Sequence, residues 1–167
     1  RDIPIVLSTN SDCELVDGLG TDANNTTHER GAMNYNVSPG WSKLSNVWDA
    51  MYSIIENANL IVEGINKSSL LTSGDSDQRA MERFKGEALT IRAMVYFDLI
   101  RLFGDIPYKS ESSNPDLSNV YLGKSDRDVI MDELIKDLET AITLLPWAGE
   151  VSAYTTERVT KGYAHSL

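Results

Sequence analysis

Residues 82–108 constrain the fold most, because they predict a long helix that is apolar around most of its circumference. At about 100° per residue, the apolar side chains of this helix fall on two adjacent stripes. One stripe is Phe84, Ala88, Ile91, Val95, Leu99 and Leu102, and the other is Leu89, Ala93, Tyr96, Ile100 and Phe103. A surface helix needs a single apolar stripe. We therefore expect this helix to lie at the centre of an all-α domain, packed on several sides.

Length and charge narrow the class of protein. With 167 residues and 41 % hydrophobic content, the chain is long enough to form one domain with its own core. The formal net charge is −10 at pH 7. Such an acidic surface repels nucleic-acid backbones and does not favour docking on anionic lipid. We therefore expect no nucleic-acid partner.

The chain order predicts four helices joined by long polar loops. Their expected ranges are about 41–65, 76–103, 126–145 and 160–167, whereas residues 1–40 show no sustained helical period. Residues 66–75 form a short polar loop, which makes the first two helices antiparallel neighbours. Stacked helix pairs of this kind are typical of tetratricopeptide-like folds.

Residue patterns that support catalysis or metal binding are missing. His28 and His165 lie far apart without metal-ligand spacing, and the sequence contains no phosphate-binding loop or dinucleotide fingerprint. Residues 22–33 begin like a calcium loop but lack its glycine and its final glutamate. Glu133 and Asp137 are spaced as solvated charges on a polar helix face. We predict that the chain is not an enzyme and holds no metal and no cofactor.

Two polar residues stand on apolar helix surfaces. Arg92 lies at the edge of the apolar surface of the long helix, where a guanidinium needs a partner. We predict a structural pair with Glu56 or Asp49, or with loop carbonyl groups. Asn59 lies in the middle of the apolar face of the first helix. We favour a buried, hydrogen-bonded Asn59 over a ligand-binding one.

Aromatic residues in or beside polar loops are the candidates for ligand binding. Tyr35, Trp41, Trp147 and Tyr154 are flanked by amide, carboxylate and guanidinium groups, an arrangement that suits sugar rings. For Trp41, sugar stacking and a position at the edge of the core remain equally open. For Trp147 and Tyr154 we favour the edge of the core.

One family shares these motifs. Gly86-Glu-Ala, Arg92-Ala, Tyr96-Phe-x-Leu and Phe103-Gly-Asp-Ile-Pro stand in the order and spacing of the SusD/RagB signature. Three further matches, at 48–59, 125–146 and 158–164, follow in the family's order. The sequence from about residue 41 to 167 therefore resembles the N-terminal portion of a SusD/RagB protein.

The resemblance implies a function as well as a fold. Members are non-catalytic lipoproteins on the surface of the outer membrane of Gram-negative bacteria, where they bind glycans or other nutrients. They cover a TonB-dependent transporter of the SusC type. The resemblance implies a chain cut at both ends, anchored only through a lipidated N-terminal Cys that lies outside this sequence. It places ligand contacts loosely at Tyr35, Asn36 and Trp41, and structural roles at Asn59, Glu87 and Arg92.

Two alternatives remain beside the expected binding of a glycan or another nutrient. A tetratricopeptide-like scaffold that binds only protein shares the same helix pattern. An α-helical glycoside hydrolase is the weaker alternative, since no convincing acid and base pair is present. The sequence does not specify the glycan.

Overall fold

The computed structural model describes residues 42–72, 76–154 and 157–167. The chain divides into two compact units, Arg1–Asp49 and Ala50–Leu167. The candidate ligand residues Tyr35, Asn36 and Trp41 lie outside the described residues, and so do His28 and the calcium-like segment. Residues 42–49 of the first helix belong to the first unit, and all other described residues belong to the second.

The regular elements of the described residues are all helices, and the all-α prediction is confirmed. The elements are α3 (Ser42–Asn66), a 3₁₀ turn (Ser69–Thr72), α4 (Ser76–Phe103), α5 (Arg127–Leu144) and α6 (Lys161–Ser166). These bounds differ from the expected ranges by at most one residue at each end. The 3₁₀ turn was not predicted. In the described ranges, none of the helices combines the length and the hydropathy that a membrane span requires.

Local chemistry fixes where helices begin and end. The Asp126 carboxylate accepts the backbone N–H of Asp128 and begins α5, and the Thr160 hydroxyl accepts that of Tyr163 and begins α6. Gly104 ends α4 with φ 74°, a left-handed conformation that glycine adopts without steric cost. Residues 105–113, the crossing segment, then lead away from α4, and Ile106 pairs with Ser125 in a single antiparallel bridge.

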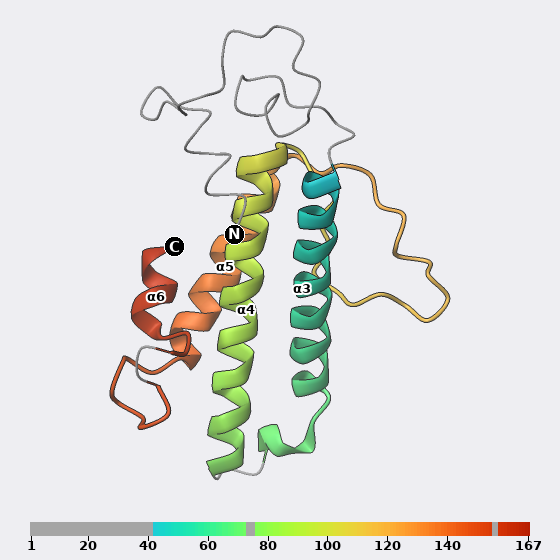
Figure 1. Cartoon of the computed structure of the whole chain (residues 1–167). Coiled ribbons are helices and arrows are strands. Elements are labelled where there is room, and N and C mark those ends of the chain that lie inside the picture. The colour runs from blue at the N-terminus through green and yellow to red at the C-terminus, as the bar shows by residue number, and fades with distance from the viewer. Residues whose placement is uncertain (1–41, 73–75, 155–156) are drawn as a thin grey trace, which may run out of the picture. The chain divides into compact units, whose positions relative to one another are not determined.

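Helix α4 lies between α3 and α5, with α6 beside α5 (Figure 1). Its nine buried residues include Gly86, Leu89, Ala93, Tyr96 and Leu99. Leu89 joins the core formed by Ala141, Leu145, Tyr154 and Ala164. Helices α4 and α5 meet closely at Gly86, where a Cβ atom would lie only 2.9 Å from Leu145 Cγ. The central helix is therefore closely packed on its α5 side.

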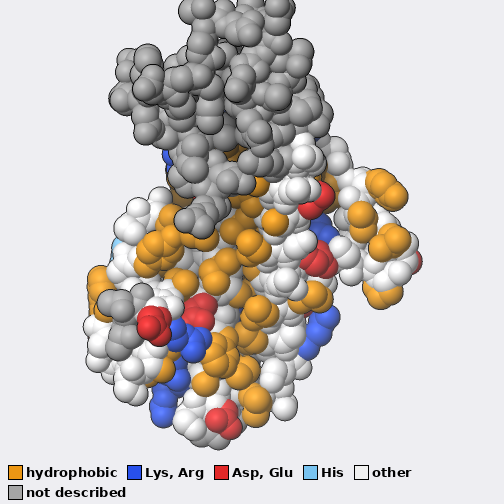
Figure 2. Space-filling view, in the orientation of Figure 1, with side chains coloured by type: hydrophobic (Ala, Val, Ile, Leu, Met, Phe, Trp, Pro, Cys, Tyr) orange, Lys and Arg blue, Asp and Glu red, His pale blue; other side chains and the backbone are white. Residues whose placement is uncertain are grey.

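Helix α4 is not covered all round, however. Phe84, expected on a packed stripe, is 37 % exposed. Leu60 and Ile61 on α3 are also exposed. Figure 2 shows hydrophobic side chains gathered on the surface of this part of the molecule. The sequence predicted packing on several sides, and this face of α4 is the one left open, because no element among the described residues covers it.

Candidate functional site

Arg92 forms the polar centre of the helical unit. Its Nε donates to Asp137 Oδ2 at 2.8 Å and its Nη2 to Asp137 Oδ1 at 2.6 Å, so that α4 and α5 are joined by a two-bond ion pair. The side chains are only 5 % and 14 % exposed. Paired N–H donors facing both carboxylate oxygens form the strongest geometry for such a pair. Arg92 therefore fixes the position of α5 on α4.

Asn59 extends this ion pair to α3 and to the crossing segment. It accepts a hydrogen bond from Arg92 Nη1 at 2.7 Å, and its Nδ2 donates to the carbonyl of Glu111 at 2.8 Å. Arg92 Nη1 also donates to the carbonyl of Ser110 at 2.9 Å. We call Arg92, Asp137, Asn59 and the Ser110 carbonyl the Arg92 junction. It connects three helices to one connecting segment.

Tyrosines and carboxylates hold the crossing segment along its length. The hydroxyl of Tyr52 donates to the carbonyl of Pro107 at 2.6 Å. The hydroxyl of Tyr96 accepts from the backbone N–H of Lys109 at 3.0 Å. The Glu56 carboxylate pairs with Lys109 Nζ at 2.8 Å. The backbone of the segment thus bonds to side chains of both α3 and α4.

Burial and pairing shift the pKa values of this region in opposite directions. Burial raises the pKa of Tyr96 to about 12, and burial also raises that of Tyr108. Burial alone would lower the pKa of Arg92, but its bonds to Asp137 outweigh that effect and raise the pKa. For Glu56, burial acts to raise the pKa, but hydrogen bonds from Lys109 and Ser113 outweigh it and lower the pKa. Pairing thus favours the charged form of both Arg92 and Glu56 in the folded protein.

The structure corrects two sequence predictions. The carboxylate partner of Arg92 is Asp137, and neither Glu56 nor Asp49. Glu56 instead binds Lys109 and Ser113. The predicted contact with loop carbonyls is present, at Ser110. Asp137 is also not a solvated charge paired with Glu133.

A second ion pair joins α4 to the residues before α6. Arg158 Nε and Nη2 donate to the two Glu87 oxygens at 2.8 and 2.6 Å. The Arg158 guanidinium carbon lies 4.8 Å from the Tyr154 ring centre and 5.3 Å from that of Phe84, within the range of cation–π attraction. Arg158 is 35 % exposed, much more than Arg92. Burial, together with Glu87, raises the pKa of Tyr154 to about 12.

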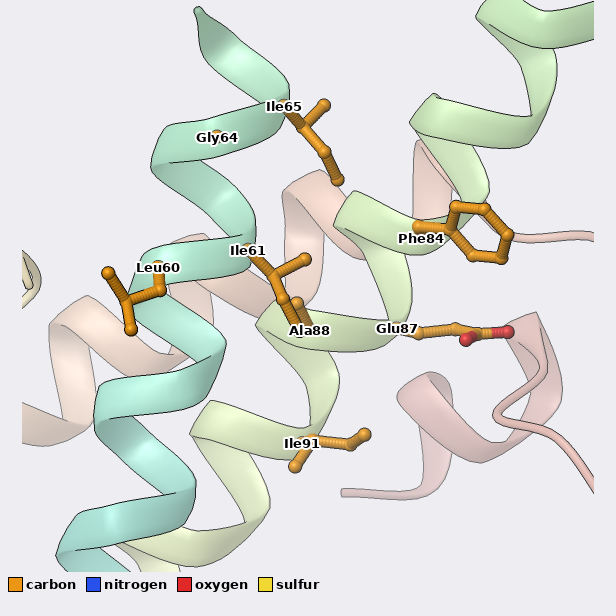
Figure 3. A pocket seen from close by; sticks show the side chains of 8 residues that line it. All are labelled: Leu60, Ile61, Gly64, Ile65, Phe84, Glu87, Ala88 and Ile91. Carbon is orange, nitrogen blue, oxygen red and sulfur yellow. The ribbon is translucent and has the colours of Figure 1, made fainter. Parts of the chain in front are cut away.

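An apolar groove of about 460 Å³ lies between α3 and α4. Its lining is apolar except for Glu87: Leu60, Ile61, Gly64, Ile65, Phe84, Ala88 and Ile91. In Figure 3, Ile61 and Ile65 point toward α4, whereas Glu87 extends away from α3. Glu87 is already bonded to Arg158. The groove therefore offers apolar contact and little hydrogen bonding, which does not suit a sugar.

The other predicted site residues fall on the surface or in the core. Tyr154 is buried in the core with Leu89. Trp147 is about half exposed, and its ring stacks on His165 at 5.8 Å between ring centres. Across residues 42–72, 76–154 and 157–167, no group of three His, Cys, Asp or Glu residues could hold a metal ion. Three contacts were not predicted from the sequence, because they are long-range: those of Glu56 and Arg158 described above, and the bond by which Glu63 accepts the backbone N–H of Ser112.

Comparison with known proteins finds similarity to one family. A family model named SusD-like, described as starch-binding and associating with the outer membrane, matches residues 3–166. Two SusD-like proteins of Formosa agariphila, P25 and P2, are each 29 % identical, over 105 and 117 residues. These alignments span 63 % and 68 % of this chain but only 19 % and 21 % of the relatives. The chain thus spans about a fifth of the length of these relatives.

Solved structures share the fold. A SusD superfamily protein from Parabacteroides distasonis matches with a TM-score of 0.69 and 24 % identity, over 85 % of this chain and 28 % of that protein. A laminarin-binding SusD-like protein matches with a TM-score of 0.68 and 25 % identity, over 82 % of this chain and 28 % of that protein. The tetratricopeptide-like helix pairs predicted from the sequence are confirmed by this similarity.

Proposed function

The chain belongs to the SusD-like family, and from this membership we propose that it is part of a non-catalytic, glycan-binding protein of the bacterial cell surface. The observation that carries the proposal is the family match over residues 3–166, whose description names starch binding and the outer membrane. A similar solved protein is named as laminarin-binding, which supports a glycan as the ligand class. The family also leaves open a variant of this proposal, in which the ligand is a nutrient other than a glycan.

We assign ligand contacts to the segment before α3, with Tyr35, Asn36 and Trp41 as the binding residues. Aromatic faces stack on the C–H face of a sugar ring, and amide groups bond to its hydroxyls. We assign structural roles to Asn59, Glu87 and Arg92. The support for these roles is geometric, because each of the three side chains is engaged by other protein groups.

The proposed partner is a TonB-dependent outer-membrane transporter of the SusC type. The protein would lie at the outer face of the membrane over this transporter, held by a lipid on an N-terminal cysteine outside this sequence. This arrangement follows from family membership, and it delivers a captured glycan directly to the protein that imports it.

Calorimetric titration of the complete gene product tests the proposal. We expect binding heat with maltooligosaccharides or with laminarin oligosaccharides, and no release of reducing sugar on prolonged incubation. Reducing-sugar release by the purified protein would instead favour a glycoside hydrolase. The absence of binding to a broad panel of glycans would contradict glycan binding.

A second candidate is a scaffold that binds only protein. The observation that favours it is the apolar groove, which has almost no hydrogen-bonding capacity for a polar ligand. This candidate predicts complex formation with the transporter but no heat with any glycan. The same titration therefore separates the two candidates.

A further inference from the structure

The connection between α4 and α5 contains a projecting loop, residues 112–123, whose base is held firmly by α3. The backbone N–H of Ser112 donates to Glu63 Oε1 at 2.6 Å, and that of Ser113 donates to Glu56 Oε1 at 2.7 Å. Charged acceptors make these hydrogen bonds stronger than those between neutral groups. Figure 1 shows the connection running out beside α3. We call residues 112–123 the 112–123 loop.

The tip of the loop is held in shape by its own polar side chains. Asn119 Oδ1 accepts the backbone N–H of Asn114 at 2.8 Å, and Asn119 Nδ2 donates to the carbonyl of Ser112 at 2.8 Å. Asn114 Nδ2 also donates to Ser118 Oγ at 2.9 Å. Leu117 is held at φ 59°, a left-handed conformation that is strained for a residue other than glycine. The loop is therefore ordered before any partner binds.

This ordered loop presents apolar side chains to solvent. Tyr121 is 94 % exposed and Leu117 58 %, and Val120 and Leu122 are also exposed. Figure 2 shows hydrophobic side chains gathered on this projecting segment. Loops are ordinarily polar, and three consecutive exposed apolar residues are expected only where they serve a function. Fixing four apolar groups in a strained loop lowers the entropy cost of binding a partner.

The chemistry of the tip selects the class of partner. Tyr121 is a single aromatic face that could stack on a sugar ring, but the three side chains beside it, Leu117, Val120 and Leu122, are aliphatic and do not stack on sugars, so a protein is favoured over a glycan. Around the tip, the exposed charged residues are two acids, Glu111 and Asp116, and one base, Lys124. This acidic rim disfavours binding to anionic lipid. Hydrogen bonds from Ser118 lower the pKa of Asp116. A rigid tyrosine among aliphatic groups with an acidic rim matches a protein pocket with a basic rim.

We propose that the 112–123 loop docks into an apolar pocket with a basic rim on the outer surface of the transporter. This inference rests on the proposed function, which supplies the transporter as partner. It assigns the contact to a surface remote in sequence from Tyr35, Asn36 and Trp41. Glycan binding and transporter docking then use different parts of the chain.

The test uses the complete gene product and the purified TonB-dependent transporter encoded beside its gene. Tyr121→Ser and Leu117→Gly remove apolar contacts, and the glycine also relieves the left-handed strain at position 117. We expect each change to raise the Kd for the transporter at least tenfold without lowering the melting temperature. Ile135→Ser is the matched control, since Ile135 is an exposed apolar residue on α5, and it should leave the Kd within twofold.

Each outcome separates this inference from the proposed function. If the wild-type protein binds the transporter and Tyr121→Ser and Leu117→Gly bind equally well, the docking loop is refuted and the proposed function stands. If the wild-type protein does not bind the transporter, the proposed partner itself fails. Loss of binding to phosphatidylglycerol vesicles, or of glycan affinity, in Tyr121→Ser with unchanged transporter binding would also overturn the inference.

Discussion

The two sides of α4 differ sharply in how they are used. The side facing α5 is closed: Gly86 allows close contact with Leu145, and Arg92 is buried in a two-bond pair with Asp137. The side facing the groove is open, with Phe84 exposed and Glu87 paired to an arginine that is still partly solvated. One helix thus contains a fixed structural face and an available apolar face. The free energy of folding should depend mainly on the closed side.

Arg92→Met tests the closed side with the largest expected effect. The change leaves the Asp137 carboxylate buried without its partner and removes the bonds from Arg92 to Asn59 and Ser110. We expect the free energy of unfolding of the complete gene product, measured in urea, to fall by about 3–5 kcal/mol.

The double variant Arg92→Met/Asp137→Leu is the control for that prediction. Apolar residues that replace both members of a buried pair are often tolerated, so at least half of the lost stability should return. A loss below about 1 kcal/mol in the single variant would show that the Arg92 junction is not structurally important.

Gly86→Ala compares the two sides directly. The new Cβ would approach Leu145 Cγ to 2.9 Å, and we expect this crowding to outweigh the better helix propensity of alanine. The expected net loss is about 1 kcal/mol, measured by urea unfolding. Gly64→Ala on α3 is the matched variant, because nothing beyond the neighbouring backbone of its own helix lies within 4 Å of its Cβ position. It should raise stability by up to about 1 kcal/mol, and a loss there would contradict an open groove.

Glu87→Gln should have a smaller effect than Arg92→Met. The guanidinium of Arg158 keeps its contacts with the Tyr154 and Phe84 rings and its access to water. We expect a loss of about 1 kcal/mol or less in urea unfolding. A loss equal to that of Arg92→Met would remove the distinction between the two sides of α4.

Glu56→Gln should produce the smallest change in the free energy of unfolding, and the size of that change should depend on pH. The pKa of Glu56 is lower in the folded protein than its ordinary value of 4.5, so its contribution is present above that value. That contribution is lost as pH falls through the folded pKa. The stability difference between wild type and variant, below about 1 kcal/mol at pH 7, should shrink as the pH falls below 4.5 and through the folded pKa of Glu56. A difference that grows on acidification would contradict the assigned role of Glu56.

The sequence predicted the helices well because their signals are local. Apolar periodicity, the caps at Asp126 and Thr160 and the terminating Gly104 lie within the elements that they define. The bond from Arg92 to a loop carbonyl was predicted correctly. Its carboxylate partner was predicted wrongly, because Asp137 lies beside the apolar stripe of α5 and only helix packing brings it to Arg92. The shape of the 112–123 loop could not be predicted from the sequence either, since it depends on side-chain hydrogen bonds of Asn114 and Asn119. The ligand residues Tyr35, Asn36 and Trp41 remain a prediction.

The central claim is that the helices form a scaffold and that the segment before α3 binds the glycan. Its most direct test is the affinity of the complete gene product for maltooligosaccharides and laminarin oligosaccharides, measured by calorimetry in Trp41→Ala and in Glu87→Gln. We predict that Trp41→Ala weakens binding at least tenfold and that Glu87→Gln changes it less than twofold. Full affinity in Trp41→Ala, or a tenfold loss in Glu87→Gln, would contradict the claim.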